Sequence, residues 1–495
     1  MNNRKSSTTM LSFPSLIILF IISQHSSLPH AHTIKTRQNL EIIIGGGGAP
    51  SPETPVCPEP IPPPPPPPEE CPPPPPPPLP PPPSPPPPRY PPPPPPRPPR
   101  PQPPKKPPQP PKKPPNPPSQ RKLSPELQRS KEVIERFRKT IGHDPKRVTD
   151  TWKGDICYDN TKYKGFICDT TIKERKLLVA LVNFNNYEFQ GFPHTPLALH
   201  NFLENLTEII AFHSNSNFFS GGIPLGLDQI RSLFELDLSN NNLNGSFPNE
   251  VLVATNLTFL DLRFNHLSGP LNPRVFNLDL NILFLNNNYF TGPIPPALGQ
   301  TPALYVTLAN NLFTGPIPAT IGNAKNTLLE ILLLGNRLTG TLPYEIGLLE
   351  KATLFDASVN KITGQIPHSF GCLKSIKYLN MSMNQLCGPV PEPLCRLPRL
   401  VKLTLSDNFI TQVGPACRKL IERKVLDVGR NCILDLPNQK SKEMCAGFFH
   451  KRPCQEPAYL NKIPCDLKSG KEPEPEPERK LMEKPRSYAA LELQG

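Results

Sequence analysis

The sequence predicts a solenoid of about ten stacked coils, with short parallel strands on its concave face. Three features recur with the same period: an asparagine every 23 to 25 residues, a Leu-x-Leu pair before it, and a glycine after it that is often followed by Ile-Pro. The asparagines are Asn217, Asn241, Asn265, Asn288, Asn311, Asn336, Asn360, Asn384 and Asn408. Since one coil cannot bury its apolar face alone, registered copies predict a stack with a shared core.

Each position of the repeat has a physical reason. The alternation in Leu236-Asp237-Leu238 makes a short strand whose leucines point into the core. The asparagine turns inward, where its amide can bond backbone groups left free by the bend. The glycine permits a tight turn, and a pair such as Ile294-Pro295 buries an apolar side chain while preventing a longer strand. The pattern is a leucine-rich repeat.

A helix is predicted just before the array. Ser124 suits the cap position and Pro125 the first turn, while Gly142 and Pro145 end the helix. The apolar residues at helical spacing are Leu127, Ile134, Phe137 and Ile141. Together with Trp152 and a nearby cysteine pair, this helix is expected to cover the first coil, which an irregular repeat over 182–191 joins to the array.

The twelve cysteines indicate disulfides, and no spacing matches a zinc site, so neither metal nor cofactor is expected. We predict Cys157–Cys168 within one cap turn and Cys395–Cys417 on adjacent coils. Cys372 and Cys387 remain as a third pair. The four cysteines of the C-terminal segment would then bond among themselves: Cys432, Cys445, Cys454 and Cys465. The connectivity of these four, of Cys372 and Cys387, and of Cys57 and Cys71 stays open.

The first 31 residues predict a secretory signal peptide. Arg4 and Lys5 precede the apolar run 16–22, which is too short to span a bilayer, and small or polar residues follow up to Ala31. The protein is therefore expected to be extracellular, in the cell wall or apoplast. Four sequons would accept N-glycans on that route: Asn205, Asn244, Asn256 and Asn380.

A proline-rich arm follows, and most of the 77 prolines of the chain lie in it. Such a run extends as polyproline II and cannot build a core, so a plain linker is one interpretation. The net charge of +13 favours a second interpretation, in which the arm binds acidic pectin through Lys105, Lys106, Lys112 and Lys113. The predicted organisation is signal peptide 1–31, proline arm 32–122, N-terminal cap 123–177, repeats 178–415, cysteine-rich cap 416–466 and a Glu-Pro tail 467–495.

With these residues in view, the chain resembles the plant leucine-rich repeat extensins over about 123–465. The segments that carry the resemblance are Trp152-Lys153-Gly154, Gly165-Phe166-Ile167-Cys168, Phe212-His213-Ser214-Asn215-Ser216-Asn217, Phe259-Leu260-Asp261-Leu262-Arg263-Phe264-Asn265 and Arg430-Asn431-Cys432 with the cysteines after it. The repeat is of the plant-specific type. One departure is plain: the proline module precedes the repeats, whereas it follows the cysteine hinge in that family.

The resemblance implies a secreted, cysteine-rich, basic signalling peptide of the rapid-alkalinisation type as partner, and a role linking the wall to growth control. Strand residues that face outward are the candidate contacts. They are His213, Glu235, Asp237, Asp261, Arg263, Phe284, Tyr305, Glu330, Asp356 and Tyr378. An acidic and aromatic strip suits a basic peptide, although aspartate between the two leucines is also frequent in plant repeats generally.

Nothing in the sequence indicates an enzyme. Glu235 and Asp237 are neighbours on one strand and cannot face each other across a cleft as glycosidase carboxylates do. Besides a peptide-binding wall protein, two alternatives stay open: a structural, pectin-binding wall protein and an inhibitor of polygalacturonases. Neither nucleic acid nor a transmembrane segment is expected, and a homodimer is compatible with the sequence, which leaves the oligomeric state open.

Overall fold

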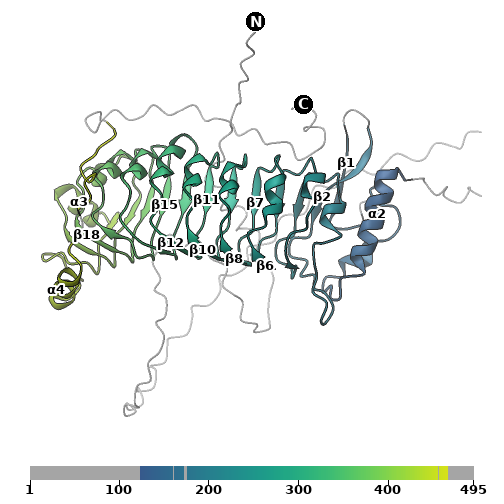
Figure 1. Cartoon of the computed structure of the whole chain (residues 1–495), viewed down its shortest axis with the longest axis horizontal. Coiled ribbons are helices and arrows are strands. Elements are labelled where there is room, and N and C mark those ends of the chain that lie inside the picture. Colours follow the sequence, from purple (N-terminus) through teal and green to yellow (C-terminus); the bar gives the residue numbers. More distant parts are fainter. Residues whose placement is uncertain (1–122, 160, 172–174, 455, 466–495) are drawn as a thin grey trace, which may run out of the picture. The chain divides into compact units, whose positions relative to one another are not determined.

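The computed structural model describes residues 123–159, 161–171, 175–454 and 456–465. The predicted signal peptide, the proline arm with its four lysines, the tail 467–495, and Cys57 and Cys71 lie outside the described residues. The described part is a leucine-rich-repeat solenoid, whose coils follow one another along the long axis in Figure 1.

One twelve-stranded sheet receives a strand from each coil, and all its pairs are parallel except the first, β1 with β2. Its strands are β1 (Phe166–Thr170), β2 (Leu177–Asn183), β3 (Ala211–His213), β5 (Glu235–Asp237), β7 (Phe259–Asp261), β9 (Ile282–Phe284), β11 (Tyr305–Thr307), β13 (Glu330–Leu332), β15 (Leu354–Asp356), β17 (Tyr378–Asn380), β19 (Lys402–Thr404) and β21 (Leu426–Asp427).

Two further parallel sheets run beside the first one, along the lower edge of the view in Figure 1. The six-stranded sheet contains β4 (Ser220–Gly221), β6 (Asn242–Ser246), β8 (His266–Pro270), β10 (Tyr289–Pro293), β12 (Leu312–Gly315) and β14 (Arg337–Leu338). The three-stranded sheet contains β16 (Thr363–Gly364), β18 (Gln385–Pro389) and β20 (Phe409–Gln412).

Short 3-10 helices complete the coils. They are η2 (Val148–Thr151), η3 (Leu203–Asn205), η4 (Leu227–Gln229), η5 (Asn249–Val253), η6 (Pro273–Asn277), η7 (Pro296–Gln300), η8 (Ala319–Asn326), η9 (Tyr344–Leu348), η10 (His368–Cys372) and η11 (Leu394–Arg396). The Ile-Pro pairs act as predicted: Ile294 and Ile317 are buried, and Pro295 and Pro318 stand at the start of η7 and η8.

The repeat asparagines form a buried ladder of hydrogen bonds, as the sequence predicts. Oδ1 of Asn265 accepts the amide of Leu243 in the preceding coil at 3.0 Å. Its Nδ2 donates to the carbonyls of Leu238 at 2.9 Å and Leu262 at 3.0 Å. The ladder extends one coil beyond the predicted array, because Asn431 makes the same bonds at its C-terminal end.

The N-terminal cap is an aromatic cluster under helix α2 (Pro125–Arg138). The side chain of Ser124 accepts the amide of Leu127, as expected for the cap, although α2 ends at Arg138 instead of Gly142. Trp152 is buried, and its Nε1 donates to the carbonyl of Lys164 at 2.9 Å. Since Phe137 stacks on Phe202 at 3.7 Å, the helix covers the apolar end of the first coils.

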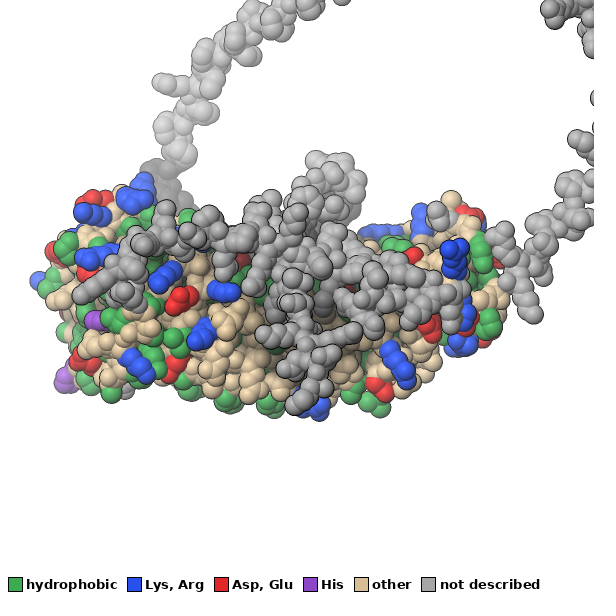
Figure 2. Space-filling view, turned by 90° about the horizontal axis from the view of Figure 1, so that it is seen from above, with side chains coloured by type: hydrophobic (Ala, Val, Ile, Leu, Met, Phe, Trp, Pro, Cys, Tyr) green, Lys and Arg blue, Asp and Glu red, His purple; other side chains and the backbone are tan. Residues whose placement is uncertain are grey.

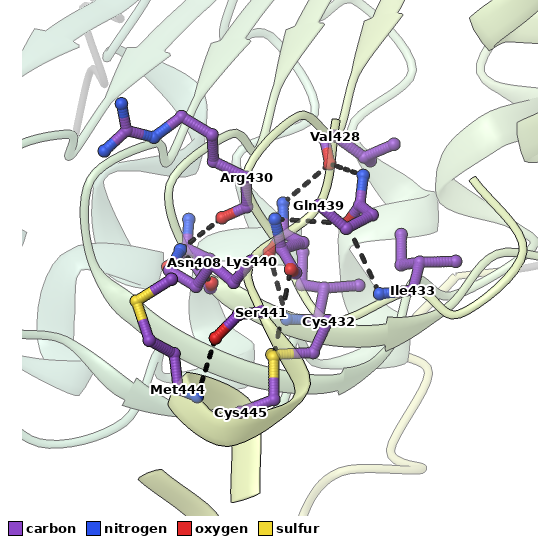
Figure 3. Close-up of a disulfide and its surroundings, with 12 residues drawn as sticks. Asn408, Val428, Arg430, Cys432, Ile433, Gln439, Lys440, Ser441, Met444 and Cys445 are labelled. Atoms are coloured by element: carbon purple, nitrogen blue, oxygen red, sulfur yellow. Dashed lines mark hydrogen bonds between the residues drawn. A yellow bond between two sulfur atoms is a disulfide. The ribbon is translucent and has the colours of Figure 1, made fainter. Parts of the chain in front are cut away.

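The C-terminal cap contains α3 (Pro415–Glu422) and α4 (Lys442–Lys451). Figure 3 shows how Cys432–Cys445 ties the start of α4 to the last coil. Lys440 lies beside this disulfide and donates from Nζ to the carbonyls of Asn408, at 2.6 Å, and Arg430. The ammonium group of Lys440 therefore bridges the last two coils of the asparagine ladder.

The structure forms the predicted pairs Cys157–Cys168 and Cys395–Cys417. The predicted pair Cys372–Cys387 is wrong, and of the bonds expected among the four C-terminal cysteines only Cys432–Cys445 forms. Cys372 bonds to Cys465 and Cys387 to Cys454, so the C-terminal cysteines do not pair among themselves apart from Cys432–Cys445. These bonds are Cys372–Cys465, Cys387–Cys454 and Cys432–Cys445.

The reason for the difference is the path of the segment after α4. This strap, residues 452–454 and 456–465, doubles back along the coils. Tyr459 places its hydroxyl 2.7 Å from Oγ1 of Thr341, and His368 donates its amide to the carbonyl of Leu460 at 3.0 Å. Nζ of Lys462 lies 4.1 Å from the ring centre of Tyr344. The strap thus brings its cysteines to coils that precede it by 67 and 93 residues.

Candidate functional site

The outward side chains of the twelve-stranded sheet form two columns, which together we call the strand face. The first column is Leu181, Ala211, Glu235, Phe259, Ile282, Tyr305, Glu330, Leu354, Tyr378 and Lys402. The second is Asn183, His213, Asp237, Asp261, Phe284, Thr307, Leu332, Asp356, Asn380, Thr404 and Asp427. This face is the surface that the sequence predicts to be concave.

The structure places every predicted contact residue on or beside this face. Glu235, Tyr305, Glu330 and Tyr378 lie in the first column, and Asp237, Asp261, Phe284 and Asp356 lie in the second. His213 lies in the second column as well, in register with Asp237. Arg263 follows Asp261 by two residues, at the next outward position.

Sequence reasoning missed the apolar members of the first column, among them Phe259, Ile282 and Leu354. Phe259, Ile282 and Leu354 stand at its outward positions and are half-buried. Each one directly precedes an inward residue of the repeat, so strict strand alternation would have identified them. They make the first column more apolar than the predicted set of residues implies.

Charged and aromatic groups interlock at the N-terminal half of the strand face. Nε2 of His213 lies 2.9 Å from Oε2 of Glu235. The guanidinium of Arg263 lies 5.1 Å from the ring centre of Phe284, which in turn meets Phe259 edge-on at 6.4 Å. A cation is therefore already held on an aromatic face at this surface, as cation–π attraction favours.

Asp261 differs from the accessible contact that the sequence predicts. Its side chain is fully buried, and its Oδ2 lies 2.9 Å from Nε of Arg263. Burial raises the pKa of the Asp261 carboxyl to about 7, with a further rise from nearby Asp237 and opposition from Arg263. The carboxyl is thus a buried support for Arg263 and does not present a free surface to a ligand.

A shared hydrogen-bond pattern explains why aspartate recurs in the second column. Oδ1 of Asp237 accepts the amide of Ser239 at 2.9 Å and its hydroxyl at 2.6 Å. Asp356 accepts the amide and hydroxyl of Ser358 in the same way. The amide oxygen of Asn380 does the same for Ser382. The column therefore needs an acceptor at this position to hold the bend after the strand, and a carboxylate is one way to supply it.

The C-terminal half of the strand face holds carboxylates that are poorly hydrated. Burial raises the pKa of Glu330 and that of Asp356, against the opposing effect of their hydrogen bonds. Burial likewise raises the pKa of Tyr305 to about 12. Because these carboxylates have lost water, a cation brought against them would restore part of the lost stabilisation.

The four sequon asparagines fall into two groups. Asn205, Asn244 and Asn256 are exposed and lie outside the strand face. Asn380 lies in the second column, where its Nδ2 donates to Oδ2 of Asp356 at 3.0 Å. A glycan on Asn380 would therefore stand on the strand face itself.

The Leucine Rich Repeat family matches residues 232–252, 256–278, 279–301 and 375–397. Leucine-rich repeat extensin-like protein 1 of Arabidopsis thaliana is 33% identical over 115 residues, which cover 23% of this chain and 14% of that protein. Leucine-rich repeat extensin-like protein 2 of the same plant is 37% identical over 113 residues, which cover 22% of this chain and 13% of that protein. The matches thus span only a small part of these longer relatives.

Among solved structures, the Arabidopsis receptor kinase HAESA, in complex with the peptide hormone IDA and the co-receptor SERK1, matches with 25% identity and a TM-score of 0.48. That match covers 62% of this chain and 54% of the other. Within the described residues, no helix is long and apolar enough to cross a membrane. The described part of the chain is a leucine-rich-repeat solenoid, and the chain is similar to the leucine-rich repeat extensin-like proteins.

Proposed function

We propose that the protein is a secreted cell-wall protein whose strand face binds a basic, cysteine-rich signalling peptide of the rapid-alkalinisation type, linking the wall to growth control. The observation that carries this proposal is the set of partly desolvated carboxylates beside aromatic rings on the strand face. Such a surface favours cationic side chains and gives them flat apolar groups to pack against.

Glu235 and Asp237 are the acids best suited to meet the peptide. Both are half-buried outward residues of β5, one in each column. Within the described residues, the hydrogen bonds of Asp237 use Oδ1, and the other oxygen is left for a ligand. Asp261, which is buried behind them, would act by holding Arg263.

Replacement by an amide separates charge from structure at Asp237. Asn380 fills the same column position and holds Ser382 through Oδ1, so Asp237→Asn keeps the acceptor for Ser239 and removes only the charge. The matched control is Asp228→Asn, which removes one exposed carboxylate from η4, away from the strand face.

The test is calorimetry of the full secreted chain with a rapid-alkalinisation peptide. We expect Asp237→Asn together with Glu235→Gln to weaken binding by ~2–5 kcal/mol, as for desolvated charge pairs, while Asp228→Asn leaves affinity unchanged. If the wild-type chain binds the peptide and the strand-face variant binds it equally well, Glu235 and Asp237 are not part of the binding site. If the wild-type chain binds no such peptide, a structural wall role or inhibition of a polygalacturonase takes the place of this proposal.

A further inference from the structure

A second surface carries the opposite charge. The residue directly after each ladder asparagine from Asn217 to Asn408 faces outward beside the strand face, and we call this set the lateral strip. Its members are Phe218, Asn242, His266, Tyr289, Leu312, Arg337, Lys361, Gln385 and Phe409. None of them is acidic, whereas both columns of the strand face contain carboxylates.

The N-terminal part of the lateral strip is aromatic and open. Tyr289 is 45% exposed and Phe218 is 42% exposed. The rings of Tyr289 and His266 stack, with centres 6.0 Å apart and planes inclined by 24°. Together they form an aromatic platform that spans two neighbouring coils.

The C-terminal part of the lateral strip is cationic. Arg337 and Lys361 are exposed, and neither forms an ion pair with a described residue. Arg452 adds a third cation, since it donates from Nη1 to Oε1 of Gln385. The disulfide Cys387–Cys454 holds the strap, and with it Arg452, at this coil.

Helix α4 closes the strip at its C-terminal end. The ring of Phe448 stacks on Phe409 with centres 3.5 Å apart, and Nζ of Lys440 lies 4.8 Å from the centre of the same ring. On the side of the molecule that Figure 2 shows, which is seen from above the view of Figure 1, Lys and Arg side chains at the left are interspersed with Asp and Glu. The open part therefore runs from the aromatic platform to the cations of Arg337, Lys361 and Arg452.

We propose that the lateral strip binds an acidic polysaccharide of the polyuronate class. The C–H face of a sugar ring packs flat on the Tyr289–His266 platform, and carboxylates further along the polymer pair with Arg337, Lys361 and Arg452. Adjacent strands lie ~4.8 Å apart, so the cations recur at a short, regular interval. A polymer with one carboxylate on every ring can use such a regular row, and the extended contact needs no pocket.

This site is separate from the predicted pectin contacts of the proline arm, and the experiment distinguishes them. The full chain is titrated with a polygalacturonate oligomer, by calorimetry at two salt concentrations. One variant combines Arg337→Gln with Lys361→Gln. A second variant is Tyr289→Ala, and a third replaces Lys105, Lys106, Lys112 and Lys113 by Gln. The matched control, Arg274→Gln with Lys325→Gln, removes one exposed arginine and one exposed lysine from η6 and η8.

We expect the Arg337→Gln and Lys361→Gln variant to bind the oligomer at least about tenfold more weakly, with a smaller salt dependence. Tyr289→Ala should weaken binding at both salt concentrations alike, because stacking is not screened. The η6–η8 control should bind as the wild type does. Unchanged affinity in both strip variants, or complete loss of binding in the arm variant alone, would overturn the lateral site. Neither result would contradict the proposal that the strand face binds a peptide.

Discussion

Asp356 and Asn380 occupy the same position in neighbouring coils, and Nδ2 of Asn380 donates to Oδ2 of Asp356 at 3.0 Å. Each residue also accepts the amide and hydroxyl of the serine two residues later. An acid and an amide thus perform the same structural task side by side. The pair shows that the acceptor oxygen at this position of the second column supports the fold, and that a negative charge is not needed for this task.

Asp356→Ala should destabilise the fold by ~2 kcal/mol, because it leaves the donors of Ser358 and Asn380 without an acceptor. Asp356→Asn keeps the bond to Ser358 and should cost no more than about 1 kcal/mol. Urea unfolding of both variants checks this ranking. Equal losses would mean that the charge of Asp356, and not its acceptor, stabilises the coil.

Asn265→Ala should cost ~3 kcal/mol or more, because it removes a buried side chain that serves the backbone of two coils. Asn277 is an exposed asparagine of η6 in the next coil, so Asn277→Ala is the control and should be nearly neutral. The unfolding midpoints of the two variants are measured side by side and compared with that of the wild type. A loss at Asn265 as small as that at Asn277 would contradict a structural role for the ladder.

Val359→Asn should stabilise the protein by about 0.5–1 kcal/mol. Val359 has a φ of 53°, a left-handed conformation that a β-branched residue adopts only with strain. Asn240, Asn287 and Asn310 fill the same repeat position with similar angles. Val401 is also exposed but is not left-handed, so Val401→Asn supplies the control. Thermal unfolding should show a higher midpoint for the first variant only, and a fall there would exclude relief of strain.

Asp261 should make stability fall as the pH rises. Its pKa is about 7 in the folded protein and near 3.8 in the unfolded chain, so the folded state holds the proton more tightly. The contribution is complete below about pH 3.8 and is lost as the pH rises through 7. Asp261→Asn removes this dependence. The free energies of unfolding of the two proteins are measured from pH 4 to 8. The variant should become more stable relative to the wild type as the pH rises. Parallel curves would contradict a raised pKa of the Asp261 carboxyl.

Removing the Cys372–Cys465 disulfide, by Cys372→Ser with Cys465→Ser, should destabilise the protein by about 3.5 kcal/mol in the chain-entropy description, because Cys387–Cys454 remains and shortens the loop that the bond closes to about 26 residues. Cys157→Ser with Cys168→Ser opens a loop of only 11 residues and should cost about 3 kcal/mol. Denaturant unfolding compares the two. The opposite ranking would mean that contacts at the N-terminal cap, and not chain entropy, dominate.

Much of the fold follows from the sequence because the repeat is local. Leu236, Asn241 and their equivalents recur with one period, and each makes its contacts within its own coil or with the next one. The disulfide between adjacent coils, Cys395–Cys417, depends on the same short spacing. The outward residues of the strand face follow from the same alternation, although Phe259 is not among the contacts that the sequence predicts.

The sequence by itself therefore determined the coil, its stacking and the chemical character of the strand face, since period and residue type decide these locally. Only the tertiary structure decided the path of the strap, the bonds Cys372–Cys465 and Cys387–Cys454, and the place of Arg452 beside Gln385. It alone also showed Asp261 to be buried. These features depend on which segments meet once the coils have stacked, and neither the burial of one outward carboxyl nor long-range pairing is encoded in a 24-residue period.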